Sequence, residues 1–295
     1  MERSSLDKKE ELRQFFRKIK KDYGYEEDRA VLDFLTKVDE QQKYIISNLD
    51  INKVRVVEYN LTFPKRRFIN TISSFCYKGR LGRKMDLLVY HGEVLLGYIQ
   101  YASPVVNSPL NRYLKEKYGH WNYKWLNQYV VELSICVPIG ILTRYLTGKL
   151  CCLVSMSKEC LDRYNHRYGT EVRELFTTSC YGRSSMYNRV RDLQYLGLTQ
   201  GWHSLVTRQE AREILNRYHH RYPWRQIKKT AQGVHLIRLL EHLDDTTTVQ
   251  PQRRGVYVCG EPFRRLEDNL QYWYKRWFIG RRARLLTELN KNVII

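Results

Sequence analysis

Residues 85–101 read MDLLVYHGEVLLGYIQY, and this stretch decides the fold. Apolar residues fill both halves, and Tyr90-His91-Gly92-Glu93 separates them. β-Branched and aromatic residues on both sides of a short turn that contains glycine are typical of a β-hairpin. The stretch therefore predicts two antiparallel strands of a sheet.

Strands and helices alternate beyond this hairpin. Residues 129–137, YVVELSICV, predict a strand that ends at Pro138, and residues 172–177 predict another. Residues 141–150 and 157–168, which lie between these strands, predict helices. Such alternation favours an α/β fold of the mixed, or α+β, kind, with a sheet flanked by helices.

Helical extensions are expected at both ends of the chain. Residues 6–48 carry apolar residues at helical spacing, and a β-branched run at Val54–Val57 follows. Near the C-terminus an apolar stripe recurs every three or four positions: Phe263, Leu266, Leu270, Trp273 and Trp277. The stripe predicts a helix that packs into the core or offers a seam for self-association. Arg264, Arg265, Lys275 and Arg276 lie around it.

These patterns divide the chain into three predicted regions. Residues 1–50 form a helical N-terminal region, residues 51–245 form the α/β core, and residues 246–295 form a loop and a basic helix.

The charge balance limits the class of partner. Lysine and arginine number 51 against 31 aspartates and glutamates, a formal net charge of +20. Such an excess suits nucleic-acid phosphates or an anionic membrane face. The basic residues are spread along the chain rather than gathered beside one amphipathic anchor, which favours nucleic acid over membrane.

Location follows from what the sequence lacks. No apolar run approaches the roughly 18 residues that span a bilayer, and the N-terminal residues carry no secretory pattern. We expect a cytoplasmic protein, in the bacterial cytosol, the nucleoid or a phage replication compartment.

Metal and cofactor sites are not expected. The seven cysteines include no CxxC pair, so we expect reduced, mostly buried thiols. The adjacent His219 and His220 would point apart on a helix or a strand, which argues against a shared metal.

The segment Glu174–Gly201, ELFTTSCYGRSSMYNRVRDLQYLGLTQG, is the first candidate site. Its hydroxyl groups could cap their own turns, or they could line the floor of a polar pocket. In the second interpretation a strand leaves the core, a polar loop follows, and the chain returns through Tyr195. The candidate nucleic-acid-binding residues are Arg183, Tyr187, Arg189 and Arg191.

Two further basic patches could contact nucleic acid. In residues 219–229, HHRYPWRQIKK, the proline stiffens a loop whose aromatic rings either stack on bases or fold back on the domain. Its candidates are Arg221, Tyr222, Trp224, Arg225, Lys228 and Lys229. A third patch is interpreted as a flexible basic loop that contacts phosphates or is simply solvated: Lys65, Arg66, Arg67, Arg80, Arg83 and Lys84. The C-terminal helix adds Arg281, Arg282 and Arg284.

Residues 80–201 as a whole resemble a known pattern. The hairpin, Glu132-Leu133-Ser134 in the next strand, Tyr187, and the run Gly197–Gly201 resemble the DruA-type domain of the Druantia anti-phage systems. The order of features is also similar to the Mom-like branch of the GNAT acyltransferase fold. The resemblance implies a GNAT-like mixed sheet and a setting of conflict between phage and host.

The same resemblance raises a coenzyme question. GNAT enzymes hold the coenzyme A pyrophosphate on free backbone N–H groups where a strand enters a helix. The equivalent turn here, Val137–Ile141, has one glycine, and Pro138 has no N–H. We therefore expect no cofactor.

The sequence favours a non-enzymatic protein that binds RNA, or alternatively single-stranded DNA, with little sequence preference. One such protein would be a phage protein that binds transcripts. A GNAT-like acyltransferase or a Mom-like nucleobase-modifying enzyme remains the alternative, and a structural protein that associates through the C-terminal stripe is a third.

Overall fold

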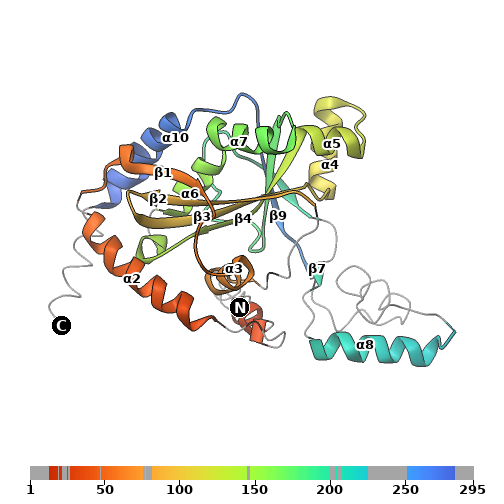
Figure 1. Ribbon diagram of the computed structural model, residues 1–295. Coiled ribbons are helices and arrows are strands. Elements are labelled where there is room, and N and C mark those ends of the chain that lie inside the picture. The colour runs from red at the N-terminus through yellow and green to blue at the C-terminus, as the bar shows by residue number, and fades with distance from the viewer. Residues whose placement is uncertain are drawn as a thin grey trace, which may run out of the picture.

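A seven-stranded sheet forms the centre of the protein (Figure 1). The computed structural model describes residues 13–18, 20–21, 25, 27–46, 48–75, 77, 82–144, 147–199, 203–204, 208–224 and 251–282. The strand order is β1-β2-β3-β4-β5-β9-β6. In chain order the strands are β1 (Val54–Glu58), β2 (Lys84–His91), β3 (Val94–Ala102), β4 (Val130–Pro138), β5 (Glu174–Ser179), β6 (Gln194–Leu198) and β9 (Gly255–Gly260). A separate ribbon pairs β7 (His203–Ser204) with β8 (Pro251–Gln252).

The predicted hairpin is confirmed. Strands β2 and β3 pair antiparallel from Lys84 opposite Ala102 to His91 opposite Val94. Gly92 occupies the turn with a φ of 57°, in the left-handed region that favours glycine. Nearly every residue of both strands is buried, because helices cover both faces of this part of the sheet. Burial of both faces explains the continuous apolar runs.

The sheet is mixed, as the alternation of strands and helices predicted. Strands β4 and β5 are parallel, whereas the other neighbours in the sheet are antiparallel. Two helices cross between β4 and β5: α6 (Thr147–Ser155) and α7 (Lys158–Tyr168). Helix α7 matches the prediction for residues 157–168, with Ser157 as its N-cap and Gly169 ending it in the left-handed region.

Helices cover the sheet on both sides (Figure 1). Helices α6, α7 and α10 (Leu266–Trp273) lie on one face, and α10 continues as a π turn, Tyr274–Phe278. Helices α2 (Arg29–Ile45) and α3 (Lys65–Ile72) lie on the other, while α4 (Ser108–Tyr118) and α5 (Tyr123–Tyr129) cover the end near β6. Helix α8 (Arg208–Arg221) lies away from the sheet. Single 3₁₀ turns occupy Ile51–Lys53 and Ile141–Arg144. In the described part of the chain, no helix is both long and apolar enough to cross a bilayer.

Three expectations need correction. Residues 65–67 lie in the first turn of α3 rather than in a flexible loop. The helix predicted at 141–150 is a 3₁₀ turn followed by α6, which begins at Thr147. The sheet also extends beyond residues 51–245, because β9 is one of its inner strands.

The C-terminal apolar stripe belongs to the core of this chain. Leu270, Trp273 and Trp277 are buried in the same cluster as Leu87 and Val89 of β2. Self-association through this stripe would require the helix to leave the core.

The side chain of Gln42 joins α2 to the sheet. It is fully buried, and its Nε2 donates to the carbonyl oxygens of Leu95 (2.7 Å) and Ile139 (2.8 Å). Its Oε1 accepts from the amide of Leu142 at 3.0 Å. Gly140, with a φ of 82°, lies so close to this side chain that a Cβ would collide with it. One amide thus satisfies three buried backbone groups.

Replacing Gln42 should destabilise the protein. Gln42→Ala leaves three buried backbone groups without partners, and each unsatisfied group costs about 1–3 kcal/mol. We expect the free energy of unfolding, measured by urea denaturation, to fall by about 3 kcal/mol or more. Gln41→Ala is the matched control. Gln41 precedes Gln42 and is exposed, so its replacement should change the free energy of unfolding by less than about 0.5 kcal/mol. Equal effects of the two substitutions would contradict this account.

Candidate nucleic-acid interface

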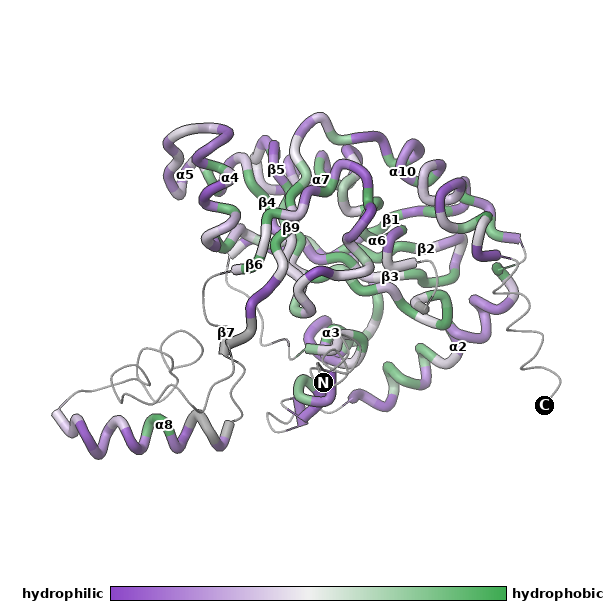
Figure 2. The backbone as a smooth tube through the Cα atoms, turned by 180° about the vertical axis from the view of Figure 1, so that it is seen from behind, coloured by the Kyte–Doolittle hydropathy of each residue, from purple (hydrophilic) through white to green (hydrophobic). Residues whose placement is uncertain are grey.

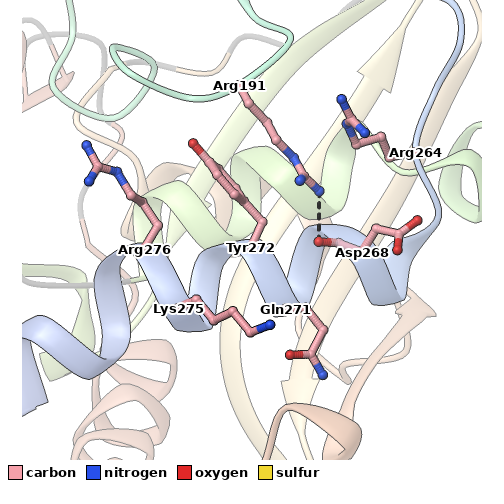
Figure 3. A pocket seen from close by; sticks show the side chains of 7 residues that line it. All are labelled: Arg191, Arg264, Asp268, Gln271, Tyr272, Lys275 and Arg276. Atoms are coloured by element: carbon pink, nitrogen blue, oxygen red, sulfur yellow. Dashed lines mark hydrogen bonds between the residues drawn. The ribbon is translucent and has the colours of Figure 1, made fainter.

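A basic groove lies where the loop between β5 and β6 meets α10 (Figure 3). Its volume is about 550 Å³. The residues that line this basic groove are Arg191, Arg264, Asp268, Gln271, Tyr272, Lys275 and Arg276. Four cationic side chains therefore face one carboxylate.

Arg191 is held in place by α10. Its guanidinium lies 4.2 Å from the centre of the Tyr272 ring. Its Nη2 donates to the backbone oxygen of Asp268 (2.7 Å, dashed in Figure 3) and to Oδ1 of Asn269 (3.1 Å). Because a planar guanidinium can use its remaining N–H groups elsewhere, Arg191 retains capacity to bind an anion.

The charges of Arg191 and Arg264 repel each other. Burial lowers the pKa of Arg191, and the positive charge of Arg264 lowers it further. Arg264 itself donates from Nε to Oδ2 of Asp192 at 2.6 Å, and this hydrogen bond raises the pKa of Arg264. Arg191 is a cation at neutral pH even so, since the guanidinium pKa starts above 12. Clustered like charges cost free energy, which a bound anion would recover.

Lys149 of α6 holds the loop that carries Arg191 in place. Its Nζ donates to the carbonyl oxygens of Ser185 and Asn188 and lies 5.0 Å from the Trp277 ring. In the same loop Arg189 and Asp192 have φ values of 63° and 62°. Such angles are uncommon for residues other than glycine and persist where the surroundings enforce them.

The first candidate segment forms as expected, but its four candidates do not share one groove. Strand β5, a loop and strand β6 follow in the predicted order, and Arg191 lines the basic groove. Arg183 and Arg189 are exposed outside this lining, with Arg183 lying 4.8 Å from the Tyr195 ring. Tyr187, a candidate nucleic-acid-binding residue, is buried. It is 5% exposed and packs 5.2 Å from the Tyr257 ring, so it cannot stack on a base.

The second candidate patch begins at the end of α8. Arg221 is exposed, and Tyr222 packs 4.9 Å from Tyr218. Trp224 is 73% exposed and meets Tyr222 edge-on at 5.8 Å. Arg225, Lys228 and Lys229 lie outside the described residues.

Much of the third patch holds the fold together. Lys65 Nζ lies 2.9 Å from Oδ2 of the buried Asp86, which also accepts from Tyr98 and from the amide of Gln100. These hydrogen bonds lower the pKa of Asp86 although burial alone would raise it. Lys65 therefore attaches α3 to the sheet, and an ion pair already satisfies it.

The neighbouring cations are engaged in the same way. Arg66 contacts the hydroxyl and ring of Tyr25, and Arg67 lies 3.6 Å from Asp28, the N-cap of α2. Arg83 donates to the backbone oxygen of Asn127, whereas Lys84 is a residue of β2. Arg281 is exposed and Arg282 half-buried near the end of α10, while Arg80 and Arg284 lie outside the described residues.

The groove residues Arg264, Lys275 and Arg276 were not assigned a role from the sequence. The signal was present, because the apolar stripe of α10 fixes which of its residues face outward. Their meeting with Arg191 could not be predicted, since it depends on packing between segments about 80 residues apart.

The geometry also bears on a coenzyme site and on a metal site. At the turn after β4, where a coenzyme pyrophosphate would need free amides, Gln42 fills the space and binds the amide of Leu142. In the described part of the chain, no three His, Cys, Asp or Glu side chains are grouped to hold a metal. The described cysteines are free thiols, and burial raises the pKa of Cys160 to about 11.

The chain matches a known protein family. The family model described as Druantia protein DruA matches residues 6–240, well over half of the chain. No curated protein matches the chain.

A small polyanion should stabilise the folded protein through the basic groove. Inorganic tripolyphosphate at a hundred times its Kd would add about 2.7 kcal/mol of stability. For a chain of this size each kcal/mol raises Tm by about 2–4 °C. We expect the Tm of the parent, measured by differential scanning fluorimetry, to rise accordingly. The Tm of Lys275→Ala with Arg276→Ala should rise much less. Lys115→Ala with Lys124→Ala, on exposed positions of α4 and α5, is the control. An identical rise in all three proteins would mean that the anion binds elsewhere.

Proposed function

The chain belongs to the DruA family, a phage-defence family of the Druantia systems, and we propose that it serves there as a nucleic-acid-binding protein. The observation that carries the proposal is the basic groove, which Arg191, Arg264, Lys275 and Arg276 line together and in which the charges of Arg191 and Arg264 repel each other. Phosphates of a nucleic-acid backbone relieve that repulsion and release counterions.

Binding through this groove should depend little on sequence. Guanidinium and ammonium groups recognise phosphate oxygens, which are the same at every nucleotide. The one aromatic ring in the groove, Tyr272, is already covered by Arg191 and is a poor platform for a base. We propose that the groove positions the strand rather than reads it.

The preferred nucleic acid is single-stranded, RNA before DNA. Trp224 exposes most of its ring beside Tyr222, and exposed rings among cations bind unpaired bases by stacking. The strands concerned would be transcripts or other single strands that arise during infection, in the cytoplasm or nucleoid of a bacterium.

The acyltransferase alternative is the weaker proposal. Its coenzyme would need free backbone amides at the turn after β4, and the side chain of Gln42 fills that space. We therefore propose a binding function without a chemical step.

Charge reversal in the groove should weaken single-strand binding. We expect Lys275→Glu with Arg276→Glu to lower affinity for a single-stranded RNA by tenfold or more, measured by fluorescence anisotropy. The slope of log affinity against log salt should shrink by about 1.4, since each lost phosphate contact removes about 0.7. Stability should barely change, because both side chains are exposed.

The control for this experiment carries the same charge change elsewhere. Lys115→Glu with Lys124→Glu should leave both affinity and salt slope close to those of the parent. If the two double variants lose affinity equally, only net charge matters and the groove is not the site. Affinity of the parent that does not depend on salt would also overturn the proposal.

Stacking by Trp224 makes a separate prediction. Trp224→Ala should weaken single-strand binding by roughly 1–3 kcal/mol, the usual contribution of one stacked base. The salt slope should stay the same, because no phosphate contact is removed. Trp224→Phe should retain most of the affinity. Unchanged affinity of Trp224→Ala, with an unchanged circular dichroism spectrum, would show that the exposed ring does not contact the strand.

A further inference from the structure

Helix α8 stands apart from the basic groove. The views from both sides place α8 beyond the β7–β8 ribbon, at the opposite end of the molecule from α10 (Figures 1 and 2). In the chain it belongs to an insertion between β6 and β9. A short ligand of α8 therefore need not contact the groove.

The two faces of α8 differ sharply. Ile214 and Tyr218, one turn apart, are 1% and 2% exposed and attach the helix on one side. Figure 2 shows the rest of α8 as mainly hydrophilic. The opposite side carries a stripe at spacings of three, four and four residues, all exposed: Gln209, Arg212, Asn216 and His220. We call these four residues the α8 stripe.

The α8 stripe is built from groups that recognise base edges. Glutamine and asparagine amides can pair with adenine through one donor and one acceptor, and arginine can pair with guanine through two donors. An imidazole offers a donor and an acceptor of its own. The lining of the basic groove has no such run of amides, so the basic groove and the α8 stripe suit different parts of a nucleic acid.

Charge and shape favour the same ligand. The helix RQEAREILNRYHHR carries four arginines against two glutamates. Arg217 and Arg221 are exposed beside the stripe, where a shallow hollow of about 700 Å³ is lined by these two residues with Asn216 and His220. Cations along one edge of a row of base-reading groups would meet the phosphate backbone on that side of a groove.

The dimensions of α8 are compatible with duplex DNA. Fourteen residues at 1.5 Å per residue give a helix about 21 Å long, and its diameter of about 10–12 Å fits the major groove of B-DNA, which is about 12 Å wide. The major groove of duplex RNA is too deep and narrow for side chains to read. We propose that α8 is a recognition helix that enters the DNA major groove and reads bases through the α8 stripe. This site does not depend on the single-strand function proposed for the basic groove.

The test starts from a pool of DNA duplexes of about 20 base pairs, roughly two helical turns, with a randomised centre. Rounds of capture by the full chain should enrich particular sequences. For an enriched duplex, Arg212→Ala with Asn216→Ala should lower affinity by about tenfold or more, since both side chains would contact base edges. Alanine favours helix, so circular dichroism should be unchanged.

The matched control removes the same chemical groups from another exposed helix surface. Arg29→Ala with Gln41→Ala takes one guanidinium and one amide from α2, and it should enrich and bind like the parent. The RNA duplex of the enriched sequence should bind at least tenfold more weakly than the DNA duplex. The inference is wrong if the parent enriches no sequence, if the α8 double variant keeps the enrichment, or if both duplexes bind equally.

The groove variant separates this inference from the proposed function. Lys275→Glu with Arg276→Glu should keep the sequence enrichment on duplex DNA, and this outcome supports an independent α8 site. If the parent fails to bind single strands but still enriches duplexes, the single-strand function fails while the α8 inference stands. If the groove variant loses the enrichment, duplex recognition depends on the groove and the α8 inference is overturned.

Discussion

Strand β9 must lie between β5 and β6, and the basic groove depends on this one placement. It pairs antiparallel with both neighbours, so that Val258 faces Phe176 on one side and Gln194 on the other. Glycines at its two ends make the fit possible. A Cβ on Gly255 would meet the backbone of Gly182, and one on Gly260 would meet the carboxylate of Glu174 and the ammonium of Lys117. The chain that follows β9 carries Arg264 and then enters α10.

That placement has an electrostatic consequence. It brings Arg264 beside the Arg191 loop, which Lys149 holds against the same helix. Burial of Trp273 and Trp277 in the core then keeps α10 from moving its cations apart. A domain of this size is stable by only about 5–15 kcal/mol, so repulsion among fixed cations is a noticeable cost. The hydrophobic core bears this cost in the free protein, and a bound anion would remove it. A rigid scaffold thus holds these cations together in the groove that we propose as the phosphate site.

Local patterns predicted the parts of the fold that depend on nearby residues. The β2–β3 hairpin, β4 and α7 follow from short runs with a turn or a cap, and all three are confirmed. Helices α3, α4 and α5 were missed because they are short and their buried sides match cores formed by distant segments. The burial of Tyr187 was missed for a similar reason. Its neighbours are polar, but the ring meets Tyr257 of β9, a residue 70 positions away, and no local pattern reports that contact. The outward cations of α10 were predictable from its stripe, whereas their pairing with Arg191 was not.

Net charge alone overstates the surface available to phosphates. Lys65, Arg66 and Arg67 form a basic run in the sequence, yet each contacts a partner that fastens α3 or the region before it. Cations with such partners gain less from a phosphate, because binding would first have to break an existing ion pair or ring contact. In the basic groove the balance differs, because Arg191 and Arg264 share the single carboxylate of Asp192 and the charge of Arg264 lowers the pKa of Arg191. Two cations that share one carboxylate keep more capacity for a phosphate than a cation that has a carboxylate of its own. The same criterion explains why a chain with +20 formal charge concentrates its proposed phosphate contacts where α10 meets the loop before β6 rather than spreading them over every basic run.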